Sequence, residues 1–249
     1  MWVKTCCLGE TVKKLSSRAV AAITNGVLAV VLIVLGCVCF FPTAAHVSSE
    51  PEDGVLRRGT SEDGVSLMFN VYWGTQEVDG ILAVLEEYGA QATFFLGGSW
   101  ADDNADCVRR IAAAGHEIGT HGYFHRDHTT LGYEGNLEEI ARSVQFLSLV
   151  TGGAVTLFAP PSGAYDDDTV NAAAALGLKT ILWSKDTIDW RDKDADTCYL
   201  RATKDISAGD FVLMHPMQHT LAALPRILGT YRERGLRAVT VSENLGITT

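Results

Sequence analysis

Short apolar runs alternate with amphipathic segments from residue 65 to the end of the chain. The apolar runs are rich in β-branched and aromatic residues, which is typical of buried strands. They predict strands in the segments VSLMFNV, ATFFLGG, HEIGTH, VTLFAPP, KTILWS, DFVLMHP and LRAVTVS. Because strands that alternate with helices form parallel βα units, the pattern predicts a distorted α/β barrel of about seven parallel strands.

The segments between these runs have helical spacing. Apolar residues recur at intervals of three and four from Val78 to Tyr88 and from Leu137 to Leu147. Further helices are expected over residues 102–114, 168–176, 195–206 and 221–234. Ligands of parallel α/β folds gather at the C-terminal ends of the strands. We therefore expect the functional residues at those ends.

The N-terminal segment differs from the rest of the chain. Residues 1–18 are basic, and residues 19–41 carry no charge and are numerous enough to cross a bilayer. This pattern predicts a cytoplasmic segment, a membrane-spanning signal-anchor at 19–41, a linker at 42–64 and a folded extracytoplasmic domain at 65–249. Later removal of the anchor, or lipid attachment at Cys37, are alternatives that the sequence leaves open.

Composition excludes some classes of partner. The net charge of -10 argues against a nucleic-acid partner, whose phosphates would be repelled. The apolar share of 47% is enough to fill the core of one large domain. Cys107 and Cys198 lie far apart in the domain, so we expect two separate thiols and neither a disulfide framework nor a zinc–thiolate site. We expect a monomer.

The histidines supply the first candidate chemistry. His121 and His125 are four residues apart after one predicted strand, and His215 follows another. Such a pair either binds a metal ion or consists of half-buried polar residues, and a third histidine at a neighbouring strand end favours the metal site. The other histidines have simpler interpretations: His116 in the turn before its strand, and His128 and His219 in solvated loops.

Five ordered motifs resemble one enzyme family. They are ATFFLGGSWA, GHEIGTHGYFH, FAPPSGAYD, LWSKDTIDW and LMHP. Over residues 65–245 the chain resembles the polysaccharide deacetylases with a NodB-homology domain, carbohydrate esterase family 4. The segment FNVYWG, residues 69–74, is similar to the sporulation-type, PdaB-like subgroup.

This resemblance implies a mechanism of amide hydrolysis. A divalent metal, usually zinc, would polarise the acetamido carbonyl and acidify a bound water, while a carboxylate acts as base. The histidines would hold the metal together with an aspartate, His215 would be the acid, and the Ser162 N–H would help to hold the oxyanion. The family pattern also implies the pocket residues Trp190 and Leu213, and Trp73 is a candidate for stacking on sugar rings.

The chain departs from the family pattern at three positions. Asn70 stands where the family has its base, and an amide cannot accept a proton at neutral pH. Val71 replaces the metal-binding aspartate, and Ala159 replaces the arginine that tunes the base. Asp186 matches the carboxylate that pairs with that arginine and so loses its partner. Glu77, Asp79 and Asp127 are near enough in sequence to be substitutes, although caps or surface positions are the simpler interpretation.

Two hypotheses for the function follow. The first is a membrane-anchored extracytoplasmic deacetylase that removes N-acetyl groups from a cell-wall glycan of the peptidoglycan type, with a role in sporulation. The second is a catalytically weak or inactive relative that binds the same glycan. The retained histidines favour the first hypothesis, and Asn70, Val71 and Ala159 favour the second. A protein scaffold has no sequence feature in its support.

Overall fold

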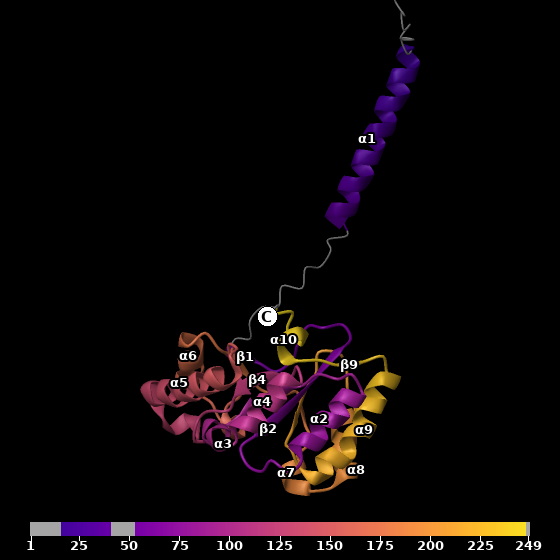
Figure 1. Ribbon diagram of the computed structural model, residues 1–249. Helices are drawn as coiled ribbons and strands as arrows, with labels where there is room; N and C mark the ends of the chain where they lie inside the picture. Colours follow the sequence, from indigo (N-terminus) through magenta and orange to yellow (C-terminus); the bar gives the residue numbers. More distant parts are fainter. Residues whose placement is uncertain (1–15, 41–52, 248–249) are drawn as a thin grey trace, which may run out of the picture. The chain divides into compact units, whose positions relative to one another are not determined.

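The computed structural model describes residues 16–40 and 53–247, which belong to two units, 1–49 and 50–249. The first unit contains helix α1 (Ser17–Phe40) (Figure 1). Within the described residues, no helix has both the length and the apolar character needed to cross a membrane. The prediction of a membrane span at residues 19–41 is therefore not supported. Its last residue, Phe41, and most of the basic segment lie outside the described residues.

The second unit is built on one parallel sheet. Among the described residues its strands run in the order β1-β6-β5-β4-β3-β2-β8-β7, with β9 also pairing with β2, and each of these pairs is parallel. The strands are β1 (Val55–Leu56), β2 (Gly64–Val71), β3 (Thr93–Leu96), β4 (Glu117–Thr120), β5 (Leu157–Phe158), β6 (Lys179–Ile181), β7 (Lys185–Asp186), β8 (Phe211–Met214) and β9 (Arg237–Ala238). This curled half-barrel confirms the predicted parallel α/β architecture.

Two short strands are additions to the seven predicted ones. β7 follows β6 after a brief turn and pairs with β8. β1 lies within residues 42–64, where we expected a linker. Val55 is fully buried there and pairs with Thr180 of β6, so this segment covers one edge of the sheet.

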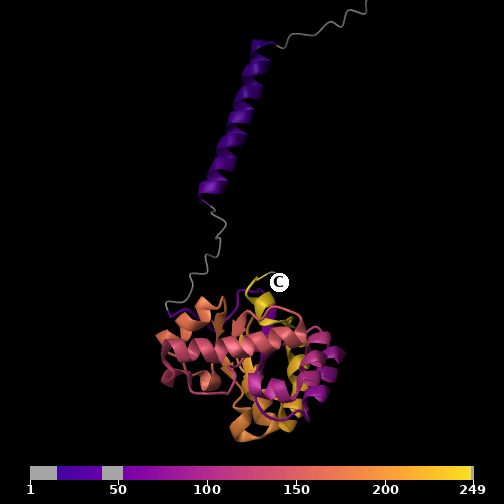
Figure 2. The same ribbon diagram turned by 60° about the vertical axis from the view of Figure 1, so that its left-hand side comes forward.

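Helices cover the outside of the sheet (Figures 1 and 2). They are α2 (Val78–Glu87), α3 (Gly98–Asp103), α4 (Ala105–Ala113), α5 (Gly132–Thr151), α6 (Asp167–Ala175), α7 (Asp189–Asp192), α8 (Ala195–Thr203), α9 (Gln218–Glu233) and α10 (Val241–Asn244), with single 3-10 turns η1 (His128–Thr130) and η2 (Pro161–Gly163). Helix α9 packs against α2 and α8, and α5 packs against α6. The helix expected over 102–114 is two helices, because the backbone leaves the helical region at Asn104.

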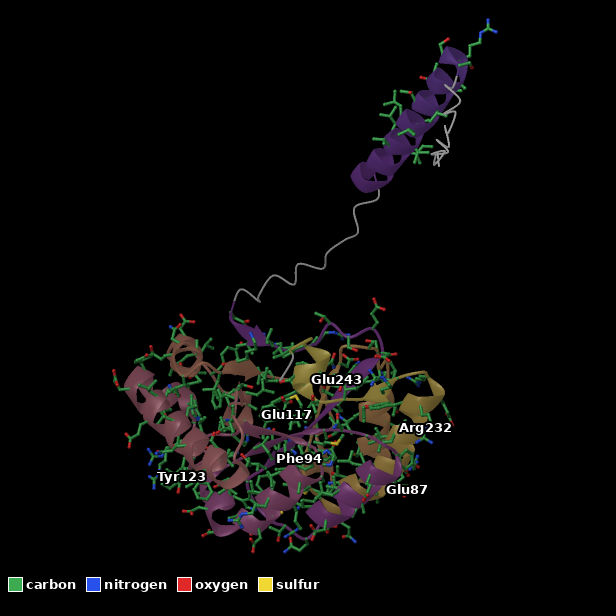
Figure 3. All side chains as sticks on the ribbon, turned by 45° about the horizontal axis from the view of Figure 1, so that its top comes forward. Glu87, Phe94, Glu117, Tyr123, Arg232 and Glu243 are labelled. Atoms are coloured by element: carbon green, nitrogen blue, oxygen red, sulfur yellow. The ribbon has the colours of Figure 1, made fainter. Side chains whose placement is uncertain are left out.

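Side chains of β2 alternate between two layers. Leu67 and Phe69 join the large core under the helices, where Phe69 stacks on Phe94. Figure 3 labels Phe94 within the domain. Met68 points to the other side, into a smaller cluster with Phe95. Since successive side chains of a strand face opposite sides, Asn70 shares the inner side with Met68 and lies at the C-terminal end of the strand.

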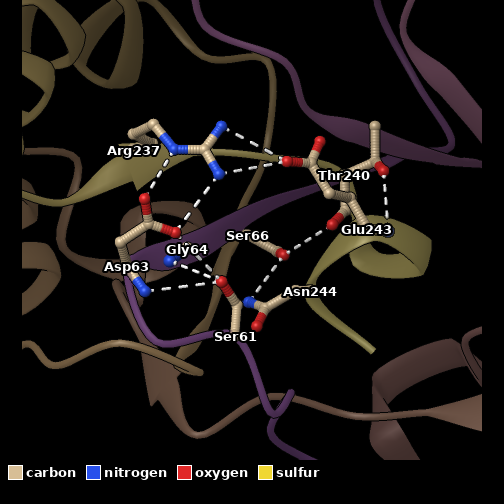
Figure 4. Close-up of polar contacts among 8 residues, drawn as sticks. All are labelled: Ser61, Asp63, Gly64, Ser66, Arg237, Thr240, Glu243 and Asn244. Carbon is tan, nitrogen blue, oxygen red and sulfur yellow. Dashed lines mark hydrogen bonds and ion pairs between the residues drawn. The ribbon is translucent and has the colours of Figure 1, made fainter. Parts of the chain in front are cut away.

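Polar contacts close the opposite end of the strands (Figure 4). Arg237 pairs with Asp63 at 2.8 Å and with Glu243 at 3.3 Å. Asn244 of α10 donates to the Ser66 hydroxyl at 3.0 Å, so the C-terminal helix is joined to the start of β2. These contacts leave the C-terminal ends of the strands as the place for a site.

Candidate active site

A pocket of about 310 Å³ lies at the C-terminal ends of the strands. It brings together all nine residues that the sequence predicts for the site: Asn70, Trp73, His121, His125, Ser162, Asp186, Trp190, Leu213 and His215. Tyr72 and Trp183 also line it, and the sequence did not single them out. The sequence-based prediction of these residues therefore agrees with their location, while their chemical roles stay predictions.

The two candidate metal ligands lie side by side. The rings of His121 and His125 are 5.0 Å apart, centroid to centroid. The His121 Nδ1–H donates to the Ala159 carbonyl at 2.7 Å, which leaves Nε2 with its lone pair. Burial, and then the neighbouring His125, lowers the pKa of His121 to about 3, and burial likewise lowers the pKa of His125. Both imidazoles are therefore neutral at physiological pH, which is the form that binds metals.

Three non-glycine residues at or beside the pocket have a left-handed backbone. His125 has φ 54°, Ser162 has φ 57° and Ile188 has φ 51°. A β-branched residue such as Ile188 rarely adopts this conformation, so the surrounding structure must impose it. Such strain is common where side chains are held in place for a ligand.

His215 is fixed by a buried carboxylate. Its Nδ1–H donates to Asp189 Oδ1 at 2.7 Å, and its backbone N–H donates to Asp189 Oδ2 at 2.7 Å. Thr220 and the Trp190 backbone N–H also donate to this carboxylate, at 2.7 and 2.8 Å. Burial raises the pKa of Asp189, but the bonds from His215 and Thr220 together lower it below its usual value. Asp189 thus orients His215 with Nε2 available to a ligand, as a catalytic acid requires.

The sequence placed Asp189 near the strand ends beside Asp186 and Trp190 but gave it no role in the site. Its signal was its place directly before Trp190 in the segment DTIDW, three residues after Asp186. Sequence reasoning chose Asp186 from this segment, but the Asp186 carboxylate accepts a hydrogen bond from the Ile188 backbone N–H at 2.8 Å and lies half-exposed at the pocket wall. No bond that fixes a histidine involves Asp186 in the described part of the chain.

Aromatic side chains form much of the pocket wall. The Trp73 ring stacks on His215 with centroids 5.7 Å apart and planes 17° apart. Tyr72 stacks on His125 at 4.0 Å. Trp73 and Trp190 remain 44% and 49% exposed, so their faces are available to an apolar surface such as that of a sugar ring.

The residues at the three altered positions are all buried. Asn70 is 4% exposed, and its Oδ1 has no hydrogen-bond partner. Val71 is fully buried in the core beneath the helices. The Ala159 methyl is also fully buried, in the small cluster with Met68 and Phe95. The structure therefore has apolar packing where the family has a metal ligand and an arginine.

None of the three candidate substitutes lines the pocket. Asp79 is exposed and pairs with Arg110 at 2.9 Å. Asp127 caps η1 by accepting from the Thr129 backbone N–H at 3.1 Å. Glu77 is the residue before the first turn of α2. The simpler interpretation of these carboxylates, as caps and surface residues, is the one that the structure supports.

The residues present do not provide the family's metal-binding set. Zinc in a catalytic site takes three protein ligands. Two neutral imidazoles are in place, but the third position is the buried valine. In the ranges 16–40 and 53–247, no group of three or more His, Cys, Asp or Glu side chains could hold a metal ion. His121 and His125 lie close together, as a metal-binding pair would, but metal binding by this pair stays a prediction.

His128 corrects one sequence-based expectation. We expected it in a solvated loop, but it is fully buried, and its Nδ1 bonds to Asn136 Oδ1 at 2.5 Å. Nearby, Glu139 of α5 accepts from the Phe124 backbone N–H at 2.5 Å. Helix α5 therefore fixes the loop that carries His121 and His125 through the side chains of Asn136 and Glu139. Cys107 and Cys198 are separate, buried thiols, as expected.

The chain is similar to two curated proteins and to a protein of solved structure. The uncharacterized protein YlxY of Bacillus subtilis is 30% identical over 200 residues, which cover 80% of this chain and 63% of that protein. A peptidoglycan-N-acetylglucosamine deacetylase of Bacillus cereus is 33% identical over 171 residues, 66% of this chain and 80% of that protein. The structure of a CE4 family pseudoenzyme from Bacillus anthracis matches with a TM-score of 0.75 and 32% identity, over 79% of this chain and 69% of that chain.

A mutant of that pseudoenzyme with restored enzymatic activity matches with the same TM-score of 0.75 and 31% identity, over 79% of this chain and 72% of that chain. The family model for polysaccharide deacetylase matches residues 57–181, half of the chain. The chain therefore belongs to the polysaccharide deacetylase family, which includes both hydrolases that act on carbon–nitrogen bonds other than peptide bonds and the pseudoenzyme named above.

Proposed function

We propose that this chain is a deacetylase-like protein that binds N-acetylated cell-wall glycan of the peptidoglycan type and releases acetate from it slowly at most. The observation that carries the proposal is the buried Val71 at the position of the metal-binding aspartate. Asn70 adds to it, because loss of a general base costs on the order of a hundredfold to ten-thousandfold in rate. The pocket otherwise keeps its acid and its aromatic walls.

The relatives support both halves of this proposal. The Bacillus cereus protein is a peptidoglycan-N-acetylglucosamine deacetylase, which supports the glycan as ligand. The similar structure from Bacillus anthracis is a pseudoenzyme, which supports weak or absent turnover. A divalent metal, with zinc as the first candidate, would bind weakly through His121 and His125 alone.

The test is acetate release from N-acetylglucosamine oligomers and from peptidoglycan, with added zinc and with a chelator. We expect at most a trace of acetate from the wild-type chain, together with measurable binding of the oligomers. The zinc content of the purified chain should be well below one ion per molecule. Rapid, metal-dependent release of acetate would overturn the proposal of slow turnover.

The location of the protein is a separate proposal. We infer an extracytoplasmic domain because its proposed ligand is a cell-wall glycan and because residues 1–18 are basic beside an uncharged run. Attachment to the lipid bilayer, a monomeric state and a role in sporulation, suggested by FNVYWG, stay predictions. Protease added to wall-stripped cells should remove the domain. Complete protection of the domain would contradict this location.

A further inference from the structure

The Asn70 side chain is buried at the pocket wall. It is 4% exposed, and its Oδ1 has no partner. Ser66, on the same side of β2, has both an acceptor and a donor, in Thr240 O and Asn244 Nδ2. A buried amide oxygen without a partner destabilises a fold, so the fold itself gives no reason for that oxygen here.

The chemistry of an amide differs from that of the carboxylate it replaces. A carboxylate only accepts hydrogen bonds, whereas an asparagine side chain both donates and accepts. An acetamido group presents one N–H donor and one carbonyl acceptor. These two groups of a trans amide point in opposite directions, so one asparagine pairs with only one of them, and its Nδ2–H can donate to the carbonyl. A carboxylate in its place would repel the carbonyl oxygen, and an apolar residue would leave the carbonyl without a partner.

The other buried atoms without partners do not compete for this role. In the described residues they belong to His128, Thr180, Ser242 and Asn244, and none of these residues lines the pocket. Around Asn70, the pocket offers the exposed faces of Trp73 and Trp190 for the sugar ring. The Leu213 side chain lies in the same wall for the acetyl methyl.

We propose that Asn70 is a specificity-determining residue that donates a hydrogen bond from Nδ2 to the acetamido carbonyl of the glycan, in the position where the family pattern has a base. This inference rests on the proposed function, because it assumes that N-acetylated glycan enters this pocket. It makes the altered position a recognition group for the intact, uncharged acetamido group. The deacetylated glycan carries an ammonium group and no carbonyl, so it offers no acceptor to the Asn70 Nδ2–H.

The experiment measures binding of two probes to the full chain by titration calorimetry, with a chelator present throughout. The probes are tetra-N-acetylchitotetraose and the tetramer of glucosamine. The variants are Asn70→Leu and Asn70→Asp, and the matched control is Asn171→Asp, which makes the same change of charge at an exposed position of α6. Thermal unfolding of each variant is recorded in parallel.

We expect the wild-type chain and Asn171→Asp to prefer the acetylated tetramer, and both Asn70 variants to bind it at least tenfold more weakly. Asn70→Leu should unfold at the wild-type temperature or above, because it removes a polar group that has no partner. A purely structural role for Asn70 would instead lower that temperature. Unchanged binding by both Asn70 variants would overturn the inference and leave the proposed function standing. Absence of any binding by the wild-type chain would overturn the proposed function itself.

Discussion

Residue 71 determines how the pocket can hold a metal ion. The neutral imidazoles of His121 and His125 are positioned side by side, but Val71 is packed into the core. An anionic ligand contributes charge as well as geometry to a divalent site, so two imidazoles alone bind weakly. The pocket therefore lacks a third metal-coordinating side chain, while the two histidines that would share the metal ion with it are in place.

Asn70→Asp combined with Val71→Asp should make the stability of the chain depend on metal. Without metal, the new carboxylate at position 71 is buried among apolar groups, and we expect a loss of roughly 1–3 kcal/mol or more in the free energy of unfolding. Added zinc should restore most of this loss and bind near one ion per chain. Thermal unfolding with zinc and with chelator measures both effects, and wild type is the control. A zinc-insensitive double variant would contradict the expected coordination.

His116 should make the fold sensitive to mild acid. Burial lowers its pKa to about 4, against about 6.5 in the unfolded chain. Between these two pKa values the unfolded state binds a proton at His116 that the folded state does not bind. The contribution of neutral His116 to the stability of the fold is therefore complete above pH 6.5 and is lost as the pH falls toward 4. The pKa values of His121, His125 and His128 are lowered too, which adds to the effect.

Substitution isolates this contribution. In His116→Gln, the dependence of the unfolding free energy on pH should fall by about 1.4 kcal/mol per pH unit between pH 4.5 and 6, the value for one proton. Urea unfolding at a series of pH values measures it. Parallel curves for wild type and variant would show that His116 does not carry the predicted proton difference.

At the scale of elements, helix α3 and the histidine loop approach each other closely. A Cβ added at Gly98 would lie 2.3 Å from the Tyr123 ring, and the Gly98 N–H donates to the Gly122 carbonyl at 2.9 Å. Arg142 of α5 covers the same ring at 4.1 Å. The loop between His121 and His125 is therefore held between α3 and α5.

Gly98→Ala should disturb this packing. We expect a loss of about 1–3 kcal/mol in the free energy of unfolding, because neither the ring nor the backbone can move freely. The matched control is Gly229→Ala in α9, where a new methyl group meets nothing within 4 Å and alanine favours the helix. Equal unfolding midpoints for the two variants would contradict the close packing at Gly98.

Asp189 connects α7, α9 and the end of β8. Its carboxylate accepts hydrogen bonds from the Thr220 hydroxyl of α9, from the His215 backbone N–H and from the His215 Nδ1–H. Asp189→Asn keeps the size but leaves at least one buried donor without an acceptor, so we expect a loss of roughly 1–3 kcal/mol. Asp194→Asn is the control, because asparagine caps a helix as well as aspartate does. Urea midpoints that are equal in the two variants would contradict the role of Asp189.

At the scale of the whole molecule, periodicity predicted the sheet because each long strand is a distinct apolar run. The seven predicted strands are present, and the nine predicted pocket residues lie at or beyond the C-terminal ends of the sheet's strands. β1 and β7 were missed because each has two residues and lies outside a longer apolar run, whereas the two-residue strands β5 and β9 lie within the runs VTLFAPP and LRAVTVS. Their existence depends on neighbouring edges, which are tertiary features.

The role of Asp189 and the burial of His128 also depend on tertiary structure. Asp189 and Asp186 are both acidic residues of one short segment, and only the fold shows which of them meets His215. His128 was predicted in a solvated loop, yet it is buried, bonded to Asn136 of α5 and beside Phe158. A sequence shows which groups are available, while burial depends on segments that are distant along the chain.

The four hydrogen bonds to Asp189 also bear on how such a protein changes over generations. A substitution of this carboxylate would leave buried donors without an acceptor, so selection for folding alone would act against it whether or not the chain hydrolyses a glycan. His215 would keep its orientation for the same reason, because its ring is fixed by that carboxylate.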